Sequence, residues 1–218
     1  MITRMHFRAN IMNEFLDEES LNDAIEADRE YVAEAIEEGR CLTVALYQHE
    51  DMLFLYYEKI DEDLEPDDLF PELSMCLNLW PEKDGLTPWA YMYHIYYHDI
   101  PTDEKYWARQ GKKKRRGRIA YLFPDTIFSY TYWHKAIVDE GLLEGDRYQS
   151  IALHENILFS YFEEPKTFTH IKKDINKESE VIKGWLEADP ESHFDHSLSG
   201  EENFLLLPEL FSMGVEDL

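Results

Sequence analysis

A phenol and an imidazole lie one helical turn apart in the second half of the chain, at Tyr130 and His134. The residues around them have helical spacing, so both side chains are expected on one face of a helix. Because imidazole titrates at about pH 6.5, His134 could both accept and donate a proton. The same spacing also fits a core tyrosine beside a histidine at the core boundary. Spacing alone leaves acid–base chemistry and core packing open.

A tryptophan on the next predicted helix could complete such a site. Trp185 lies within residues 177–188, which have helical spacing. An indole beside an acid–base pair can hold the apolar face of a sugar ring, but it can equally be a core side chain. Whether Trp185 contacts a ligand depends on how its helix packs against the helix that carries His134.

The elements that must position these side chains are repeated in the sequence. Residues 49–58, HEDMLFLYYE, return as residues 154–163, HENILFSYFE, with six of ten positions identical. Each copy ends one alternating apolar run, crosses a polar corner and starts another, which is typical of a β-hairpin. A period of about one hundred residues is too long for a solenoid and suits a duplicated small domain.

Both halves predict the same element order of strand, helix, strand, strand, helix and strand. This βαββαβ order is that of a ferredoxin-like domain, in which a four-stranded sheet carries two helices on one face. The other face is apolar and needs a partner. We therefore predict an α+β protein of two tandem ferredoxin-like domains that pair their sheets as an intrachain dimeric α+β barrel. Their predicted ranges are residues 1–98 and 118–218, with a basic linker at residues 99–117.

One segment resembles a known enzyme family. Residues 124–134, PDTIFSYTYWH, are similar to the strand-to-helix segment of the L-rhamnose mutarotases, with the pattern P-D-x4-Y-x3-H. Residues 181–185, VIKGW, resemble the second-helix stretch of that family, where a tryptophan lines the sugar site. The resemblance implies a dimeric α+β barrel and a cofactor-free aldose mutarotase. In it His134 and Tyr130 would be catalytic, and Trp185 and Asp125 would bind a monosaccharide.

The implied reaction interconverts the anomers of a free aldose. One group protonates the ring oxygen while another removes the proton of the anomeric hydroxyl, and the opened ring then recloses. Two departures affect this hypothesis. The family has a tryptophan pair where this chain has Trp185-Leu186, and this chain is several residues shorter between His134 and the next strand. In addition, the first half has no histidine on its corresponding helix. The resemblance therefore places the single site in the C-terminal half.

Two other functions stay open. Asn10 and Trp80 faintly resemble the related antibiotic-biosynthesis monooxygenases and haem-degrading barrels. No histidine lies where the second helix of those proteins needs one. The other alternative, from a different class, is a non-catalytic small-molecule-binding or stress-related barrel protein in which both ancestral sites have decayed.

Metal and cofactor signatures are missing from the sequence, which has no glycine-rich phosphate loop, CxxC or HExxH. His94 and His98 alternate with Tyr96, and with His193 or His196 they could bind a divalent metal. Histidines on an aromatic strand are equally explained as buried and hydrogen-bonded. We predict no metal and no cofactor.

Net charge and cysteine content limit which partners and which cellular compartment are expected. The net charge of −25 repels nucleic acid and anionic lipid, so we expect neither partner. The basic run at residues 112–118 could be a nucleic-acid tail, but a connector against acidic neighbours explains it better. The two cysteines, Cys41 and Cys76, fit reduced thiols. Without a signal-peptide pattern or an apolar span of about twenty residues, we expect a cytoplasmic protein.

Overall fold

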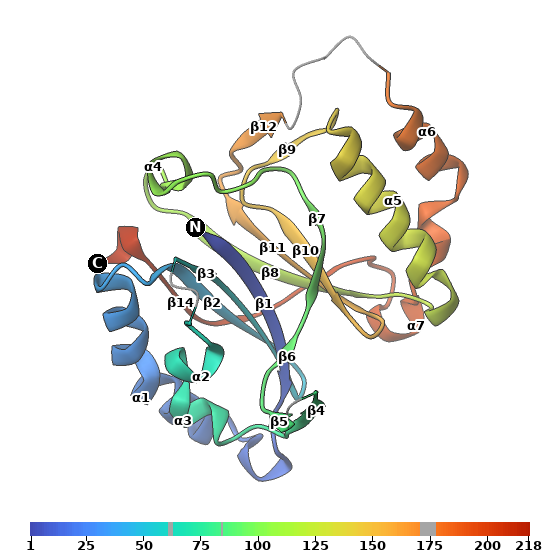
Figure 1. Ribbon diagram of the computed structural model, residues 1–218. Helices are drawn as coiled ribbons and strands as arrows, with labels where there is room; N and C mark the ends of the chain where they lie inside the picture. The colour runs from blue at the N-terminus through green and yellow to red at the C-terminus, as the bar shows by residue number, and fades with distance from the viewer. Residues whose placement is uncertain (61–62, 84, 171–177) are drawn as a thin grey trace. The chain divides into compact units, whose positions relative to one another are not determined.

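The chain folds into two compact units, each built on a five-stranded antiparallel sheet (Figure 1). The computed structural model describes residues 1–60, 63–83, 85–170 and 178–218. Unit 1 comprises Met1–Met92, Pro101–Lys112 and Pro208–Leu218; unit 2 comprises Tyr93–Ile100 and Lys113–Leu207. Each unit is of the α+β class, as predicted.

Unit 1 has the ferredoxin-like strand order with one strand added. Its elements are β1 (Thr3–Asn10), η1 (Asn13–Phe15), α1 (Glu18–Glu37), β2 (Cys41–His49), β3 (Met52–Lys59), α2 (Pro66–Leu69), α3 (Pro71–Ser74), β4 (Trp80–Glu82), β5 (Gly85–Thr87), β6 (Ala90–Tyr91), α4 (Glu104–Trp107), β14 (Glu209–Gly214) and η4 (Val215–Asp217). The sheet order is β14-β2-β3-β1-β6. Without β14, this is the antiparallel order of a βαββαβ domain.

Unit 2 repeats that order. Its elements are β7 (Tyr93–Tyr97), β8 (Lys114–Tyr121), η2 (Pro124–Thr126), α5 (Ile127–Glu140), β9 (Glu144–Asp146), β10 (Ser150–His154), β11 (Ile157–Glu164), β12 (Phe168–His170), α6 (Glu180–Glu187), η3 (Pro190–His193), α7 (His196–Ser199) and β13 (Leu205–Leu206). The sheet order is β13-β8-β11-β10-β7. The added strand, β7, pairs with β10 as β14 pairs with β2. The predicted pairing of the two sheets as a barrel stays a prediction.

The repeated sequence forms the same hairpin in both units. Glu50 and Glu155 stand first in the two-residue corners, with φ of 55° and 54°. The second residue of each corner accepts a hydrogen bond from the backbone N–H of the residue that follows β1 in unit 1 or β8 in unit 2. These bonds run from Ile11 N to Asp51 O (2.8 Å) and from Leu122 N to Asn156 O (2.9 Å). The matched sequence therefore marks structurally equivalent turns.

Helix α1 begins after an aspartate N-cap and ends before a glycine. The Asp17 carboxylate accepts a hydrogen bond from Ser20 N at 2.8 Å, and Gly39 follows the helix with φ of 73°. The buried face is aliphatic except for Asp28, whose carboxylate accepts from the N–H groups of Glu72 (3.0 Å) and Leu73 (2.8 Å). These N–H groups lie in the first turn of α3, so α1 caps a second helix across the core.

The second helix of the βαββαβ order is not continuous in unit 1. Two four-residue helices, α2 and α3, replace it. Phe70 between them is non-helical, at φ −135° and ψ 61°, because Pro71 disfavours helical geometry in the preceding residue and lacks an N–H. The corresponding helix of unit 2, α6, runs from Glu180 to Glu187, and its predicted first residue at 177 lies outside the described residues.

The strand boundaries also differ from those predicted. The aromatic run at residues 89–98 contains two strands, β6 in the sheet of unit 1 and β7 in that of unit 2. The C-terminal strand β14, which was not predicted, pairs with β2 of unit 1. An alternating apolar run predicts a strand but does not specify its pairing partner.

The basic run is not only a connector. From Lys114 onward it forms β8, which pairs with the acidic end of β11. Arg116 Nε lies 2.9 Å from the Glu164 carboxylate, and Lys113 Nζ donates to the Pro165 carbonyl at 2.7 Å. The expectation that these bases lie against acidic neighbours is confirmed, whereas the linker range of 99–117 is corrected at its C-terminal end.

Candidate functional site

Helix α5 places the two residues of the predicted acid–base pair on its buried face. Tyr130 is 1 % exposed and His134 is 9 % exposed. The helix ends at Gly141, which adopts φ of 63° and donates its N–H to Ile137 O at 3.0 Å. In unit 2, α6 lies beside α5 (Figure 1), which brings Trp185 to the same cluster.

Three of the four predicted site residues come together in direct ring contact. Tyr130 and His134 are stacked, with ring centroids 3.9 Å apart and an interplanar angle of 22°. Trp185 meets both rings edge-on, at 5.7 Å from Tyr130 and 5.0 Å from His134. Because the rings touch one another, the space among them is filled by side chains.

Asp125, predicted to bind substrate, lies elsewhere. It is exposed on η2, ahead of the helix, and no contact joins it to the three rings. The segment Pro124–Thr126 forms a short 3-10 turn in place of the first turn of α5. This turn separates the carboxylate from the buried helical face.

The environment of His134 fixes its protonation. Its Nδ1 lies 2.9 Å from the carbonyl of Tyr130, which can only accept, so Nδ1 carries the hydrogen. Burial lowers the pKa of His134 to about 4 despite that bond, and nearby His193 lowers it further. Burial also raises the pKa of Tyr130. At neutral pH this is a neutral imidazole beside a neutral phenol, which is a weak acid–base pair.

The cluster includes residues that spacing did not identify. Tyr96 of β7 meets His134 edge-on at 5.2 Å, and His193 lies 5.3 Å from Trp185 between ring centroids. His193 Nε2 is also 2.9 Å from the hydroxyl of Ser129. The sequence suggested His193 only as a possible metal ligand. No motif links it to Ser129, because 64 positions separate the two.

Unit 1 has no such ring cluster on its long helix but contains a cavity of about 490 Å³. The cavity lies among the C-terminal end of α1, the start of β2, the end of β3, α4 and η4. Its inner wall includes Cys41 and Trp107, both fully buried, and exposed Val215 also lines it. Leu42 and Ile60 complete an apolar lining that extends from the surface to the edge of the sheet.

A buried ion pair stands behind this cavity. Arg109, which lines it, donates two hydrogen bonds to the Glu58 carboxylate, at 2.5 Å and 2.7 Å. The exposed fractions of the two side chains are 4 % and 0 %. Burial alone would raise the pKa of Glu58, but the charge and hydrogen bonds of Arg109 and a 2.7 Å bond from Tyr56 hold that pKa below its usual range. The Arg109–Glu58 pair therefore adds little net charge to the cavity wall, which also includes the acidic residues Glu104 and Glu216.

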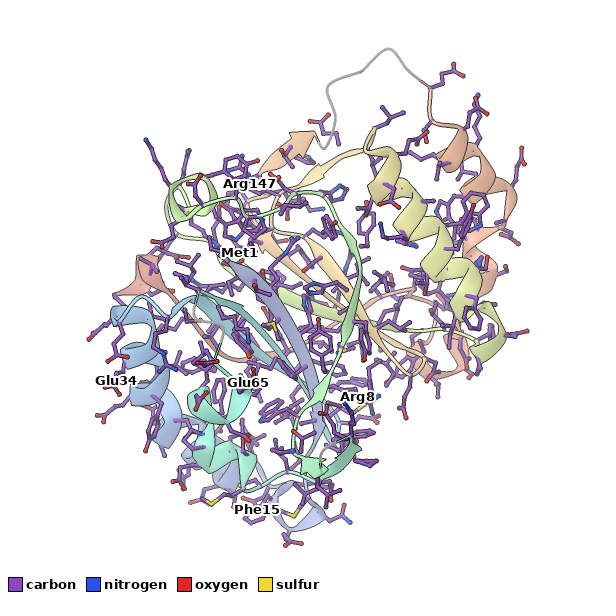
Figure 2. The ribbon with its side chains drawn as sticks, viewed as in Figure 1. Met1, Arg8, Phe15, Glu34, Glu65 and Arg147 are labelled. Carbon is purple, nitrogen blue, oxygen red and sulfur yellow. The ribbon has the colours of Figure 1, made fainter. Side chains whose placement is uncertain are left out.

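The residues that suggested a monooxygenase lie near each other in unit 1. Asn10 Nδ2 donates to the Asp51 carboxylate at 3.0 Å. The guanidinium of Arg8, which is labelled in Figure 2, lies 4.8 Å from the ring of Trp80. Arg8 also donates to Asn10 Oδ1 at 3.5 Å. These contacts form a polar network at the C-terminal end of β1, where Arg8 is buried.

His98, one of the histidines considered as a metal ligand, is buried and hydrogen-bonded. Its Nε2 lies 3.0 Å from the hydroxyl of Tyr96, and the ring is 5 % exposed. Among the residues that the structure describes, no group of three or more His, Cys, Asp or Glu could hold a metal ion. None of the described helices has the length and apolar character needed to span a membrane.

Comparisons with known proteins give structural similarities only at low identity. No family model matches the sequence, and no curated protein matches it. A "putative monooxygenase" from Lactobacillus acidophilus NCFM matches 99 % of this chain and 98 % of its own, with TM-score 0.44 and 8 % identity. A "putative monooxygenase" from Fusobacterium nucleatum matches 100 % and 95 %, with TM-score 0.44 and 11 % identity.

A "putative chlorite dismutase" is similar at TM-score 0.42 and 11 % identity, over 95 % of this chain and 94 % of its own. At TM-scores below 0.5, these similarities support no inference about the activity of this chain. The ferredoxin-like order of each unit instead follows from its own strand pairing.

Proposed function

We propose that this protein binds a small apolar molecule in the cavity of unit 1. The single observation that supports this is the cavity itself, at about 490 Å³. Ligand pockets commonly span about 300–1,000 Å³ and are lined mainly by apolar and aromatic side chains. The lining by Leu42, Ile60, Trp107 and Val215 fits that description.

The walls indicate the kind of ligand. Trp107 offers an indole, and the Arg4 guanidinium lies 5.4 Å from the ring on the protein side. The charge of Arg109 is balanced by Glu58, so this arginine gives an anionic ligand little net attraction. An uncharged, partly aromatic molecule of about 15–25 heavy atoms suits such a lining better than a monosaccharide does. The protein would then act as a small-molecule-binding module.

A neutral fluorescent probe tests this proposal. N-phenyl-1-naphthylamine should bind saturably with one site per chain, and its emission should rise on binding. The variant Ala108→Trp, which adds a large side chain to the lining, should weaken binding at least about tenfold, or 1.4 kcal/mol. Leu86→Trp on the exposed β5 is the matched control and should bind as the wild type does.

Either of two results would refute the proposal. One is the absence of saturable binding by the wild-type protein. The other is equal affinity in wild type and Ala108→Trp, which would place the probe elsewhere. A thermal-unfolding curve of each variant distinguishes a blocked cavity from a chain that has lost its fold.

The enzymatic hypotheses are secondary. Asn10 and Trp80 faintly resemble the antibiotic-biosynthesis monooxygenases, so the binding experiment should include oxygen consumption with an easily oxidised polyphenol in place of the probe. The sugar mutarotase hypothesis assigns His134 and Tyr130 to catalysis. It has less support, because the pKa of His134 is about 4 and its ring is packed against three others. Anomer exchange measured by NMR, unchanged by added protein, would exclude it.

A further inference from the structure

We propose that Ser129 and His193 in unit 2 form a serine–histidine dyad that hydrolyses small carboxylic esters. The hydroxyl of Ser129 lies 2.9 Å from His193 Nε2, within the range in which a base can take the proton of a nucleophile. His193 is 3 % exposed, whereas Ser129 is half-buried. This inference is independent of ligand binding in unit 1.

The imidazole is held in the orientation that a general base needs. His193 Nδ1 lies 3.2 Å from the carbonyl of Asp189, which can only accept, so Nδ1 carries the hydrogen and Nε2 presents its lone pair to Ser129. Asp189 adopts φ of 51°, a left-handed conformation that is uncommon for a non-glycine residue. That conformation turns its carbonyl toward the following 3-10 turn, η3. A strained residue that aims a catalytic partner is typical of functional sites.

The backbone of His193 is fixed to the start of α5. Its carbonyl accepts from Phe123 N at 3.0 Å and from the hydroxyl of Thr126 at 3.1 Å. Thr126 is the N-cap of α5, so these bonds join the segment that carries the base to the helix that carries the nucleophile. Such rigid attachment keeps the 2.9 Å distance between the two reacting groups.

The position of Ser129 also favours the negative charge that develops in ester hydrolysis. Ser129 is the third residue of α5, a helix of 14 residues whose N-cap side chain makes no capping hydrogen bond. The positive end of the helix dipole therefore lies beside the nucleophile. Backbone N–H groups at such a terminus stabilise the oxyanion of a tetrahedral intermediate.

The neighbouring rings indicate the substrate class. Trp185 is half-buried and lies 5.3 Å from His193, and Tyr130 lies 6.2 Å from it. Tyr130 is buried, so substrate can contact only the exposed part of Trp185, which suits an ester with an apolar acyl group. An uncharged carbonyl orients the base here in place of a carboxylate, so the imidazolium is less stabilised than in a triad. The dyad should therefore favour esters with good leaving groups over amides.

Ester hydrolysis by this dyad needs water as its only co-reactant. The Ser129 oxygen bonds to the ester carbonyl carbon while its proton moves to His193 Nε2. The carbon–oxygen bond to the alcohol then breaks, and the leaving alkoxide takes that proton. Water, deprotonated by His193, attacks the acyl-serine, and collapse releases the carboxylic acid and returns the proton to Ser129.

Covalent labelling of the wild-type protein is the decisive experiment. A fluorophosphonate probe should add one equivalent per chain, and peptide mapping should locate it on Ser129. Hydrolysis of p-nitrophenyl butyrate should exceed that in buffer and should fall at least about a hundredfold in Ser129→Ala and His193→Gln. Ser197→Ala and His196→Gln, at exposed positions nearby, are the matched controls and should keep the wild-type rate.

Three results would overturn the dyad: no labelling above that of heat-denatured protein, labelling of another serine, or an unchanged rate in Ser129→Ala. Since His193→Gln alters a buried ring, its fold must be checked by circular dichroism. Ser129→Ala changes a half-buried helical position toward the best helix former and should fold, so it decides the outcome alone.

Discussion

The two units have the same strand order, but different side chains pack around their sheets. Both carry a buried tyrosine–glutamate pair on the third strand of the repeat, Tyr56–Glu58 and Tyr161–Glu163, with the same 2.7 Å hydrogen bond. Both glutamates have no exposed surface. The pair therefore belongs to the shared strand framework. The differences lie in the helices and in the segments outside the six-element repeat.

Helix composition accounts for much of this difference. The buried face of α1, 20 residues long, is mainly aliphatic, whereas the 14-residue α5 buries Tyr130 and His134. In unit 2 the rings on α5 contact α6 and η3. In unit 1 a cavity remains at the C-terminal end of α1. One framework thus supports a packed aromatic cluster in one unit and an open apolar pocket in the other.

The largest expected effect tests the ion pair behind the unit 1 cavity. Arg109→Met removes the positive charge and leaves the Glu58 carboxylate buried without it. Losing one partner of a buried pair costs about 3–5 kcal/mol of unfolding free energy. Chemical denaturation followed by circular dichroism should show this loss.

The matched control is an exposed ion pair in unit 2. Arg116→Met removes a partner of Glu164, and the exposed fractions of these side chains are 26 % and 46 %. Such pairs contribute about 0–1 kcal/mol, so a small loss is expected. Adding Glu58→Gln to Arg109→Met should restore part of the stability. Equal losses in the two single variants would mean that burial does not distinguish the pairs.

The next effect concerns pH and the ring cluster of unit 2. The folded pKa of His134, about 4, lies below its unfolded value of about 6.5. The unfolded chain therefore takes up the proton first as pH falls. The stability due to neutral His134 is complete above pH 6.5 and is lost as the pH falls from 6.5 to 4. A pKa difference of this size corresponds to about 3 kcal/mol of unfolding free energy.

The measurement compares wild type with His134→Phe, which keeps a ring but has no titratable nitrogen. From pH 7 to pH 4, the unfolding free energy measured by urea titration should fall by about 3 kcal/mol more in wild type than in the variant. His196→Gln controls for replacement of an exposed histidine. Parallel losses in wild type and His134→Phe would show that His134 is not the responsible group.

Local sequence patterns predicted the features that depend on residues close to one another in the sequence. The repeat identified both hairpins, and helical spacing brought Tyr130 and His134 onto one buried face, with Trp185 on the adjacent helix. Pairing partners were missed, because alternation shows that a run such as residues 89–98 is a strand but not which sheet it joins. Asp125 was misplaced because a 3-10 turn precedes α5.

The candidate dyad and the cavity could not be predicted for a related reason. Ser129 and His193 meet only through tertiary packing, as do Leu42, Trp107 and Val215 around the cavity. No fixed spacing identifies either group. The protonation of His134 likewise depends on burial by three other rings, which a sequence pattern does not quantify.

The smallest expected effect tests whether the two hairpins are equivalent. Glu50 and Glu155 hold φ of 55° and 54°, which a β-carbon disfavours and glycine accepts readily. Each Glu→Gly change relieves that strain but makes the unfolded chain more flexible, so the net gain should be about 0.5–1 kcal/mol. If the corners are the same turn, Glu50→Gly and Glu155→Gly should shift the denaturation midpoint equally, and the double variant should show the sum. A gain in one corner and a loss in the other would mean that surrounding contacts set the turn geometry, so the repeated sequence alone would not specify the hairpin.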